Sequence, residues 1–119
     1  MESALRGVFL TSDEPHQTAR FYMEVAGLPL EAVGSADEHV FWRVDRDELQ
    51  LAIHDAKAFA DYAHPVVPGS NLTHLYFKIN DQPAFLAHIE ALGLVPIAVD
   101  EVVVTVRDPD GRIVMFGTA

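Results

Sequence analysis

The stretch Asp13-Glu14-Pro15 returns later in the chain as Asp81-Gln82-Pro83, and both copies follow an apolar run and precede a helical pattern. Gly27-Leu28, which ends the first helical pattern, returns in the same way as Gly93-Leu94. Asp and Pro are typical of a helix start, and Gly suits the position just beyond a helix end. Signals that recur together at a nearly constant spacing predict two related modules in one chain.

A hairpin turn follows each helix and completes the repeat. Asp45-Arg46-Asp47 in the first half corresponds to Asp108-Pro109-Asp110-Gly111 in the second, where Pro and Gly stand at positions that a type I turn prefers. We therefore expect an α+β fold of two βαβββ modules, residues 1–63 and 70–119, that form a curved mixed sheet with a concave cleft. Prolines and a glycine interrupt the pattern at 64–69, which we interpret as a linker within a single domain, 1–119.

Apolar and polar residues alternate along several segments, as in strands with one buried face. The first helix should be capped by Ser12 or Asp13, and the second by Asp81. A short helix is expected at 56–63. Strands are expected at 5–11, 28–33, 39–44, 48–54, 72–79, 95–99, 101–107 and 112–118.

Composition narrows the possible functions. The 119 residues include 18 acidic and 8 basic side chains, for a net charge of −10, which argues against nucleic acid as a partner. The acidity suits either solubility or attraction of a cationic ligand. The absence of cysteine excludes disulfides and thiolate chemistry and fits a cytoplasmic location. All apolar runs are far shorter than the roughly 20 residues of a membrane helix.

Three features together resemble the vicinal-oxygen-chelate superfamily, which includes glyoxalase I, bleomycin-resistance proteins and extradiol dioxygenases. These features are Phe21-Tyr22 before Gly27-Leu28, the bulky residues near Leu75, and Asp108-Pro109-Asp110-Gly111 followed by an apolar strand. The resemblance covers essentially the whole chain. It implies paired βαβββ modules, a cleft lined by the sheet, and a homodimer.

The enzymes of this superfamily bind a divalent metal at four positions, which the resemblance places at Gly7, Gln50, His74 and Met115. Glycine offers no donor, and a methionine thioether suits Cu(I) better than hard or borderline divalent ions. We therefore expect no metal cofactor. The alternative is a divalent metal site in which His54 joins His74.

Residues with the same strand parity as these positions are candidates for ligand binding. The face on which Trp42 lies depends on the length of the hairpin loop. A three-residue loop places Trp42 opposite Gln50 in the cleft, and a two-residue loop places Arg43 there. The candidate ligand-binding residues are Phe9, Trp42, Gln50, His54, His74, Tyr76 and Met115.

The leading hypothesis is a metal-free protein that binds a cationic or aromatic small molecule, such as an antibiotic or a toxic metabolite. The first alternative is a metal-dependent lyase, isomerase or dioxygenase of the same superfamily. A metal-free enzyme would use His74 as general base and Tyr76 as proton donor. A partner-binding module that uses the fold alone is the remaining hypothesis.

Overall fold

The chain divides into two compact units, Met1–Pro68 and Gly69–Ala119. The computed structural model describes residues 2, 4–35, 40–61 and 73–119. The expected linker at 64–69 lies outside the described residues. No helix in the described part of the chain is long and apolar enough to cross a membrane.

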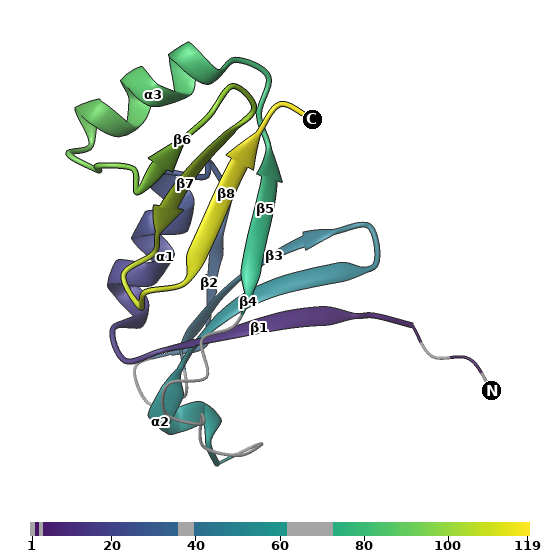
Figure 1. The fold of residues 1–119 in the computed structure, drawn as a ribbon. Coiled ribbons are helices and arrows are strands. Elements are labelled where there is room, and N and C mark those ends of the chain that lie inside the picture. The colour runs from purple at the N-terminus through teal and green to yellow at the C-terminus, as the bar shows by residue number, and fades with distance from the viewer. Residues whose placement is uncertain (1, 3, 36–39, 62–72) are drawn as a thin grey trace. The chain divides into compact units, whose positions relative to one another are not determined.

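The first unit is a βαβββ module with a short terminal helix (Figure 1). Its sheet has the strand order β1-β4-β3-β2, in which β1 and β4 are parallel and the other pairs are antiparallel. The elements are β1 (Gly7–Ser12), α1 (Pro15–Glu24), β2 (Glu31–Val33), β3 (Phe41–Arg46), β4 (Leu49–Asp55) and α2 (Ala56–Phe59).

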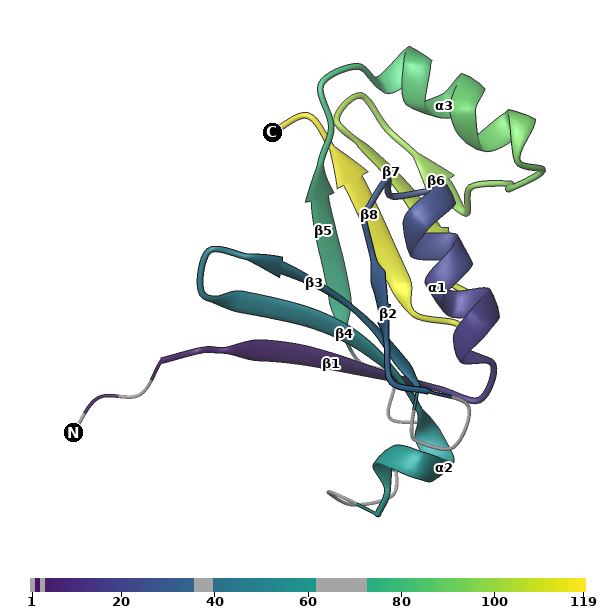
Figure 2. The ribbon, with the colours of Figure 1, turned by 180° about the vertical axis from the view of Figure 1, so that it is seen from behind.

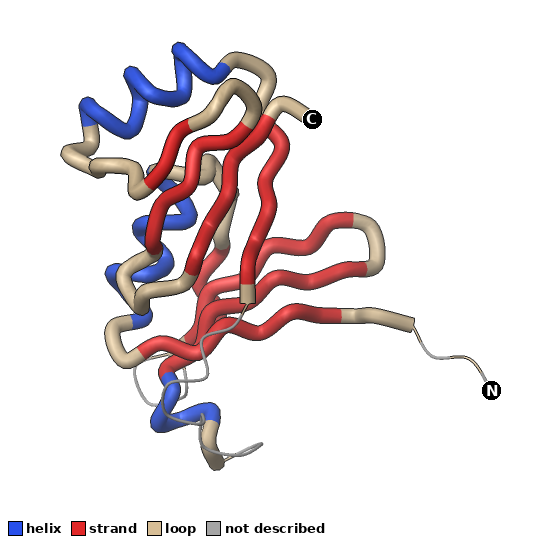
Figure 3. Tube along the Cα trace, in the orientation of Figure 1, coloured by secondary structure: helices blue, strands red, loops and turns tan. Residues whose placement is uncertain are grey.

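The second unit repeats this topology with the strand order β5-β8-β7-β6 and parallel pairing of β5 with β8 (Figure 1). Figure 3 shows the strands of both units in red and the helices in blue. The elements are β5 (His74–Lys78), α3 (Gln82–Ala91), β6 (Ala98–Val99), β7 (Val103–Arg107) and β8 (Ile113–Gly117). The expectation of an α+β fold with two βαβββ modules is therefore confirmed. A concave cleft formed by the two modules together stays a prediction.

Both helices end as the glycines predict. Gly27 and Gly93 have positive φ angles of 69° and 74°, a backbone conformation that glycine adopts without steric cost. The next residue then donates its N–H back to the last helical turn, Leu28 to the Tyr22 carbonyl at 3.0 Å and Leu94 to the Ile89 carbonyl at 2.9 Å. Gly27-Leu28 and Gly93-Leu94 therefore end the two helices.

The strands after the two helices are consequently shorter than expected. In place of strands over 28–33 and 95–99, the sheets include only Glu31–Val33 and Ala98–Val99. Pro29 and Pro96 lie just before these strands and have no N–H to donate to a neighbouring strand. The helix expected at 56–63 is also shorter, since α2 ends at Phe59.

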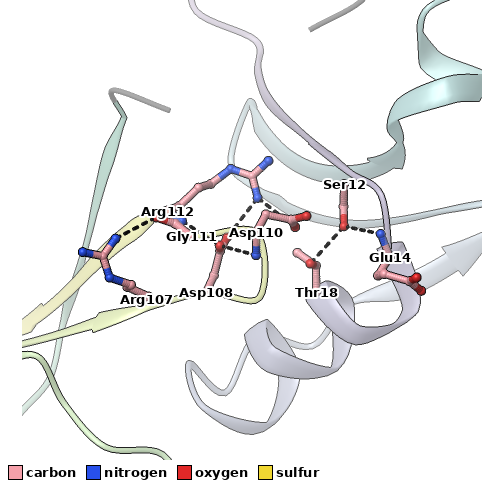
Figure 4. A network of polar contacts seen from close by, with 8 residues as sticks. All are labelled: Ser12, Glu14, Thr18, Arg107, Asp108, Asp110, Gly111 and Arg112. Carbon is pink, nitrogen blue, oxygen red and sulfur yellow. Dashed lines mark hydrogen bonds and ion pairs between the residues drawn. The ribbon is translucent and has the colours of Figure 1, made fainter. Parts of the chain in front are cut away.

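The two helix starts differ. Asp81 caps α3 as expected, because its carboxylate accepts a hydrogen bond from the Ala84 N–H at 3.0 Å. The expected side-chain cap on α1 is wrong: the N-cap is Glu14, and it makes no such bond. Ser12 instead accepts from the Glu14 N–H and shares a hydrogen bond with the Thr18 hydroxyl, both at 3.0 Å (Figure 4). This pair fixes the junction between β1 and α1.

Each helix covers one face of its own sheet and buries the apolar side chains there. In the second unit, α3 runs alongside β6 and β7 (Figure 2), and Phe85 stacks on Phe116 of β8 with ring centroids 4.5 Å apart. In the first unit, α1 contributes Ala19, Phe21 and Tyr22 to the core. The opposite face of each sheet, which α2 covers in part in the first unit, is here named its open face.

The Asp108-Pro109-Asp110-Gly111 turn is stabilised by a buried ion pair. Asp108 accepts hydrogen bonds from the backbone N–H groups of Asp110 and Arg112 at 2.9 Å, and its second oxygen pairs with the Arg112 guanidinium at 2.9 Å. Gly111 has φ 88°, as this turn requires. Figure 4 shows Asp108 and Asp110 both directed toward the Arg112 side chain. The motif therefore determines the geometry of the β7–β8 connection.

We predict that Asp108→Ala lowers the free energy of unfolding by about 3 kcal/mol, because it removes one partner of a buried ion pair. Urea denaturation would measure the loss. Asp110→Ala is the matched control, since Asp110 pairs with Arg112 at a longer 3.3 Å, and it should cost about 1 kcal/mol or less. Equal losses in the two variants would contradict the importance of the buried pair.

The turn between β6 and β7 depends on Asp100. Its carboxylate accepts hydrogen bonds from the backbone N–H groups of Val102 at 2.7 Å and Val103 at 2.8 Å. The bond from Val103, followed by that from Val102, lowers the pKa of Asp100 below its ordinary value of 3.8. The ionised form is therefore the one that this turn favours.

A lowered folded-state pKa means that the Asp100 carboxylate stabilises the protein at pH values above 3.8, and that this contribution is lost as the pH falls through the folded-state pKa. We expect thermal unfolding scans between about pH 5 and pH 2 to show a shallower loss of stability in Asp100→Ala than in the wild type. An NMR titration of the Asp100 carboxyl carbon gives the pKa directly. A pKa at or above 3.8 would refute the prediction.

Candidate functional site

Strand register defines the open face of the first sheet. Phe9 on β1, Ala52 on β4 and Arg43 on β3 are neighbours in one row across the strands. Gly7 and Gln50 are partners in the adjacent row. Successive side chains of a strand point to opposite faces, so these five residues share one face, and the core residues between them point toward α1.

Phe9 and Gly7 form a close pair at the edge of this face. The Phe9 side chain is 52% exposed. A Cβ atom added to Gly7 would meet two carbons of the Phe9 ring at 2.8 and 3.0 Å, which is closer than packed carbon atoms approach. Glycine at position 7 therefore allows the Phe9 ring to lie over the backbone of its own strand. The position that the resemblance assigned to a metal ligand supports an aromatic side chain instead.

His54 lies at one end of the open face and is only 8% exposed. Its ring stacks on Phe41 with centroids 4.6 Å apart, lies tilted against Phe59 of α2 at 4.6 Å, and contacts Phe9 edge-on at 5.5 Å. Sequence reasoning identified Phe9 and His54 but missed Phe41 and Phe59. Phe41 shares the strand parity of Arg43, so correct hairpin register would have identified it.

Gln50 is held in place by a neighbour on the same face. Its side-chain nitrogen donates to the Asp45 carboxylate at 3.2 Å, and Asp45 is its register partner on β3. This bond fixes the orientation of the Gln50 amide. The structure thus places Gln50, Phe9 and His54 on one surface, as expected.

Trp42 lies on the opposite face. The β3–β4 hairpin has a two-residue loop, Asp47-Glu48, in which Asp47 has a φ of 55°, so the three-residue alternative is wrong. Trp42 pairs with Ile53, is buried, and contacts the His16 ring edge-on at 4.7 Å. Its parity excludes it from the face of Gln50.

Arg43 takes the open-face position instead, as the two-residue alternative required. The pairing of β3 with β4 is, however, shifted by two residues along β4 from the expected one. Asp45 lies directly opposite Gln50, and Arg43 lies opposite Ala52.

The open face of the second sheet carries the remaining candidates. Tyr76 is 47% exposed and pairs with Met115, whereas His74 pairs with Ile113. The Tyr76 hydroxyl donates to the Ala119 carbonyl at 2.7 Å, and its ring lies against Gly117, where an added Cβ would be about 3 Å from ring carbons. Each module therefore presents one half-exposed aromatic ring backed by a glycine.

The donors at the four family positions fit a divalent cation poorly. Gly7 and Gln50 together offer one neutral amide, and Met115 is not the register partner of His74. Among the described residues, no group of three His, Asp or Glu side chains is close enough together to hold a metal ion. A catalytic divalent site ordinarily needs about three protein ligands.

The chain resembles known proteins over nearly its whole length. Residues 7–115 match the family described as the glyoxalase-like domain. No curated protein sequence matches the chain.

Among solved structures, a lactoylglutathione lyase from Agrobacterium tumefaciens is 21% identical with a TM-score of 0.63, over 98% of this chain and 93% of that one. An antibiotic-binding protein, TnmS3 from Streptomyces sp. CB03234, is 18% identical with a TM-score of 0.65, over 98% and 95%. A trypanothione-dependent glyoxalase I from Leishmania major is 13% identical with a TM-score of 0.68, over 98% and 86%.

These structural likenesses establish the fold, and the family match extends over both modules. The protein is therefore a member of the glyoxalase-like family within the vicinal-oxygen-chelate superfamily.

Proposed function

We propose that each module of the protein binds a flat aromatic small molecule on the open face of its own sheet and needs no metal ion to do so. The observation that carries this proposal is the pair of half-exposed rings, Phe9 over Gly7 and Tyr76 against Gly117. In each module the ring stands on the open face of the first strand and is backed by a residue without a side chain.

Burial of such a ring by a ligand supplies substantial free energy. An aromatic side chain has about 150–250 Å² of accessible surface, so covering the exposed half removes roughly 100 Å² from water. At about 25 cal/mol per Å² this contributes roughly 2–3 kcal/mol per ring. Stacking geometry adds about 0.5–1.5 kcal/mol. One such ring therefore provides a useful part of the affinity without any catalytic group.

The comparisons support a binding role. One structural neighbour is named as an antibiotic-binding protein, and sequestration of an aromatic antibiotic or a toxic metabolite requires affinity alone. The alternative is a metal-dependent lyase, isomerase or dioxygenase, and one neighbour is named as a lactoylglutathione lyase. The alternative is weaker because the family positions provide few donors for a divalent ion. Tyr76 as proton donor is also less favoured, because its hydroxyl donates to Ala119.

We expect planar polycyclic antibiotics and simpler naphthalene derivatives to bind and to shift the amide signals of the open-face strands in NMR titrations. Phe9→Ala should weaken binding to the first module by roughly tenfold, and Tyr76→Ala should do the same for the second module, because each removes the stacking surface of its own module. Leu49→Ala is the control: Leu49 is 40% exposed but has the opposite parity on β4. Equal affinity in the wild type and both aromatic variants would contradict the proposal.

We also expect protein purified without chelator to contain far less than one metal ion per chain, because the donor set is poor. EDTA should change neither the melting temperature nor the affinity for an aromatic ligand. Elemental analysis and thermal unfolding with and without EDTA would measure this. A stoichiometric metal whose removal abolishes binding would favour the lyase or dioxygenase alternative.

The resemblance further implies a homodimer, and we include that state in the proposal. Sedimentation velocity of the whole chain would distinguish a dimer from a monomer.

A further inference from the structure

Arg43 has a buried side-chain nitrogen without a partner. Its Nε atom is inaccessible to solvent and makes no hydrogen bond. Within the described residues, the Arg43 guanidinium makes no hydrogen bond and no ion pair. Buried polar groups almost always have a partner, so an exception on a candidate binding face calls for an explanation.

The acidic residues on the same face do not fill this role. Glu31 is the register partner of Arg43 on β2, yet these two described residues form no ion pair. Asp45 lies two residues further along β3, and its carboxylate accepts the Gln50 amide instead. The guanidinium therefore has no protein partner among the described residues; its Nε is enclosed, the residue as a whole is partly exposed, and a ligand would meet the terminal nitrogens.

Arg43 lies in the same row of the sheet as Phe9, whose ring is the proposed stacking surface. Phe9, Ala52 and Arg43 are consecutive in one row across β1, β4 and β3. Neighbouring strands are about 4.8 Å apart, so Phe9 and Arg43 are separated by about 10 Å at the backbone. Ala52 between them contributes only a methyl group and is 0% exposed, so the ligand would lie over the side chains that flank Ala52. A bicyclic aromatic acid is long enough to meet the ring at one end and the guanidinium at the other.

We propose that Arg43 determines ligand choice by pairing with an acceptor group, best a carboxylate, on the aromatic ligand that stacks on Phe9. This inference rests on the proposed aromatic-binding function and makes it more specific. A planar guanidinium matches the two oxygens of a carboxylate, and such charge-assisted bonds are stronger than neutral ones. The ligand class is therefore an aromatic acid.

The net charge of −10 does not oppose this choice. Exposed charges that lie more than about 8 Å away are largely screened at physiological ionic strength. A partly shielded guanidinium at contact distance is screened much less. Glu31 and Asp45 lie nearer than this screening distance on the same face and partly offset the attraction of an anion to Arg43, and the relative affinities for an acid and an amine measure that balance.

Three ligands that share one ring system test this inference: 2-naphthoate, 2-naphthamide and 2-(aminomethyl)naphthalene. NMR titration of the full chain gives each affinity. We expect the naphthoate to bind most tightly and the amine least tightly. Arg43→Gln should weaken naphthoate binding by about tenfold or more while leaving the amine unchanged or improved. Arg43→Lys keeps the charge but lacks the planar guanidinium, so its affinity for naphthoate should lie between those of the wild type and Arg43→Gln.

Arg46→Gln is the matched control, because it removes the same charge from the same strand at an exposed position of opposite parity. It should leave all three affinities unchanged. Thermal unfolding provides a second readout: Arg43→Lys should be at least as stable as the wild type, since the Cε methylene of lysine replaces the unsatisfied buried Nε donor.

The outcomes separate this inference from the function on which it rests. If none of the three ligands binds, the aromatic-binding function fails and this inference fails with it. If all three bind equally, or the amine binds most tightly, only the inference about Arg43 is overturned. If Arg43→Gln and Arg43→Lys lose all three ligands together along with stability, Arg43 has a structural role and the inference is again overturned.

Discussion

The parallel pairing of the first strand of each module with its last strand is the interaction on which the rest of each unit depends. β1 pairs with β4 from Gly7↔Gln50 to Ser12↔Asp55, and β5 pairs with β8 in the same sense. These contacts are far apart in sequence and form only when the helix and hairpin between them have folded back. The pairing brings the two family positions Gly7 and Gln50 together and defines which face the helix covers.

The helix then divides the sheet into two chemical environments. Toward the helix, aliphatic and aromatic side chains are buried, and in the second unit Phe85 and Phe116 stack at the centre of this layer. On the open face, the same strands carry side chains that do not pack against the helix. Because the alternation of a strand is strict, core packing determines the direction of every open-face side chain as well.

The two modules share one topology but differ in their hairpin turns and in the side chains of their open faces. In the first module, β3 and β4 are joined by a two-residue loop with Asp47 at positive φ. In the second module, β7 and β8 are joined by the longer turn that Asp108 and Arg112 stabilise. The first open face also gathers Phe41 and Phe59 around His54. The two open faces thus carry different side chains on one topology, and function has to be argued from those side chains.

Local sequence signals were sufficient for much of the architecture. Gly27 and Gly93 predicted the helix ends, Asp81 predicted a capped helix, and alternation placed Phe9, Gln50 and His54 on one face. These features depend on backbone conformations and side-chain periods that neighbouring residues determine. The α1 cap was wrong because Ser12 bonds to Thr18 and the Glu14 N–H.

The tertiary structure decided the side-chain constellation. The register of β3 against β4 turns Trp42 into the core and Arg43 onto the open face, because a change of one residue in a hairpin loop reverses every side chain of the strand. The grouping of Phe41 and Phe59 around His54 likewise requires a hairpin and a helix to meet in space. The sequence by itself determined the modules and the alternation within strands, and only long-range packing decided which side chains share the candidate site.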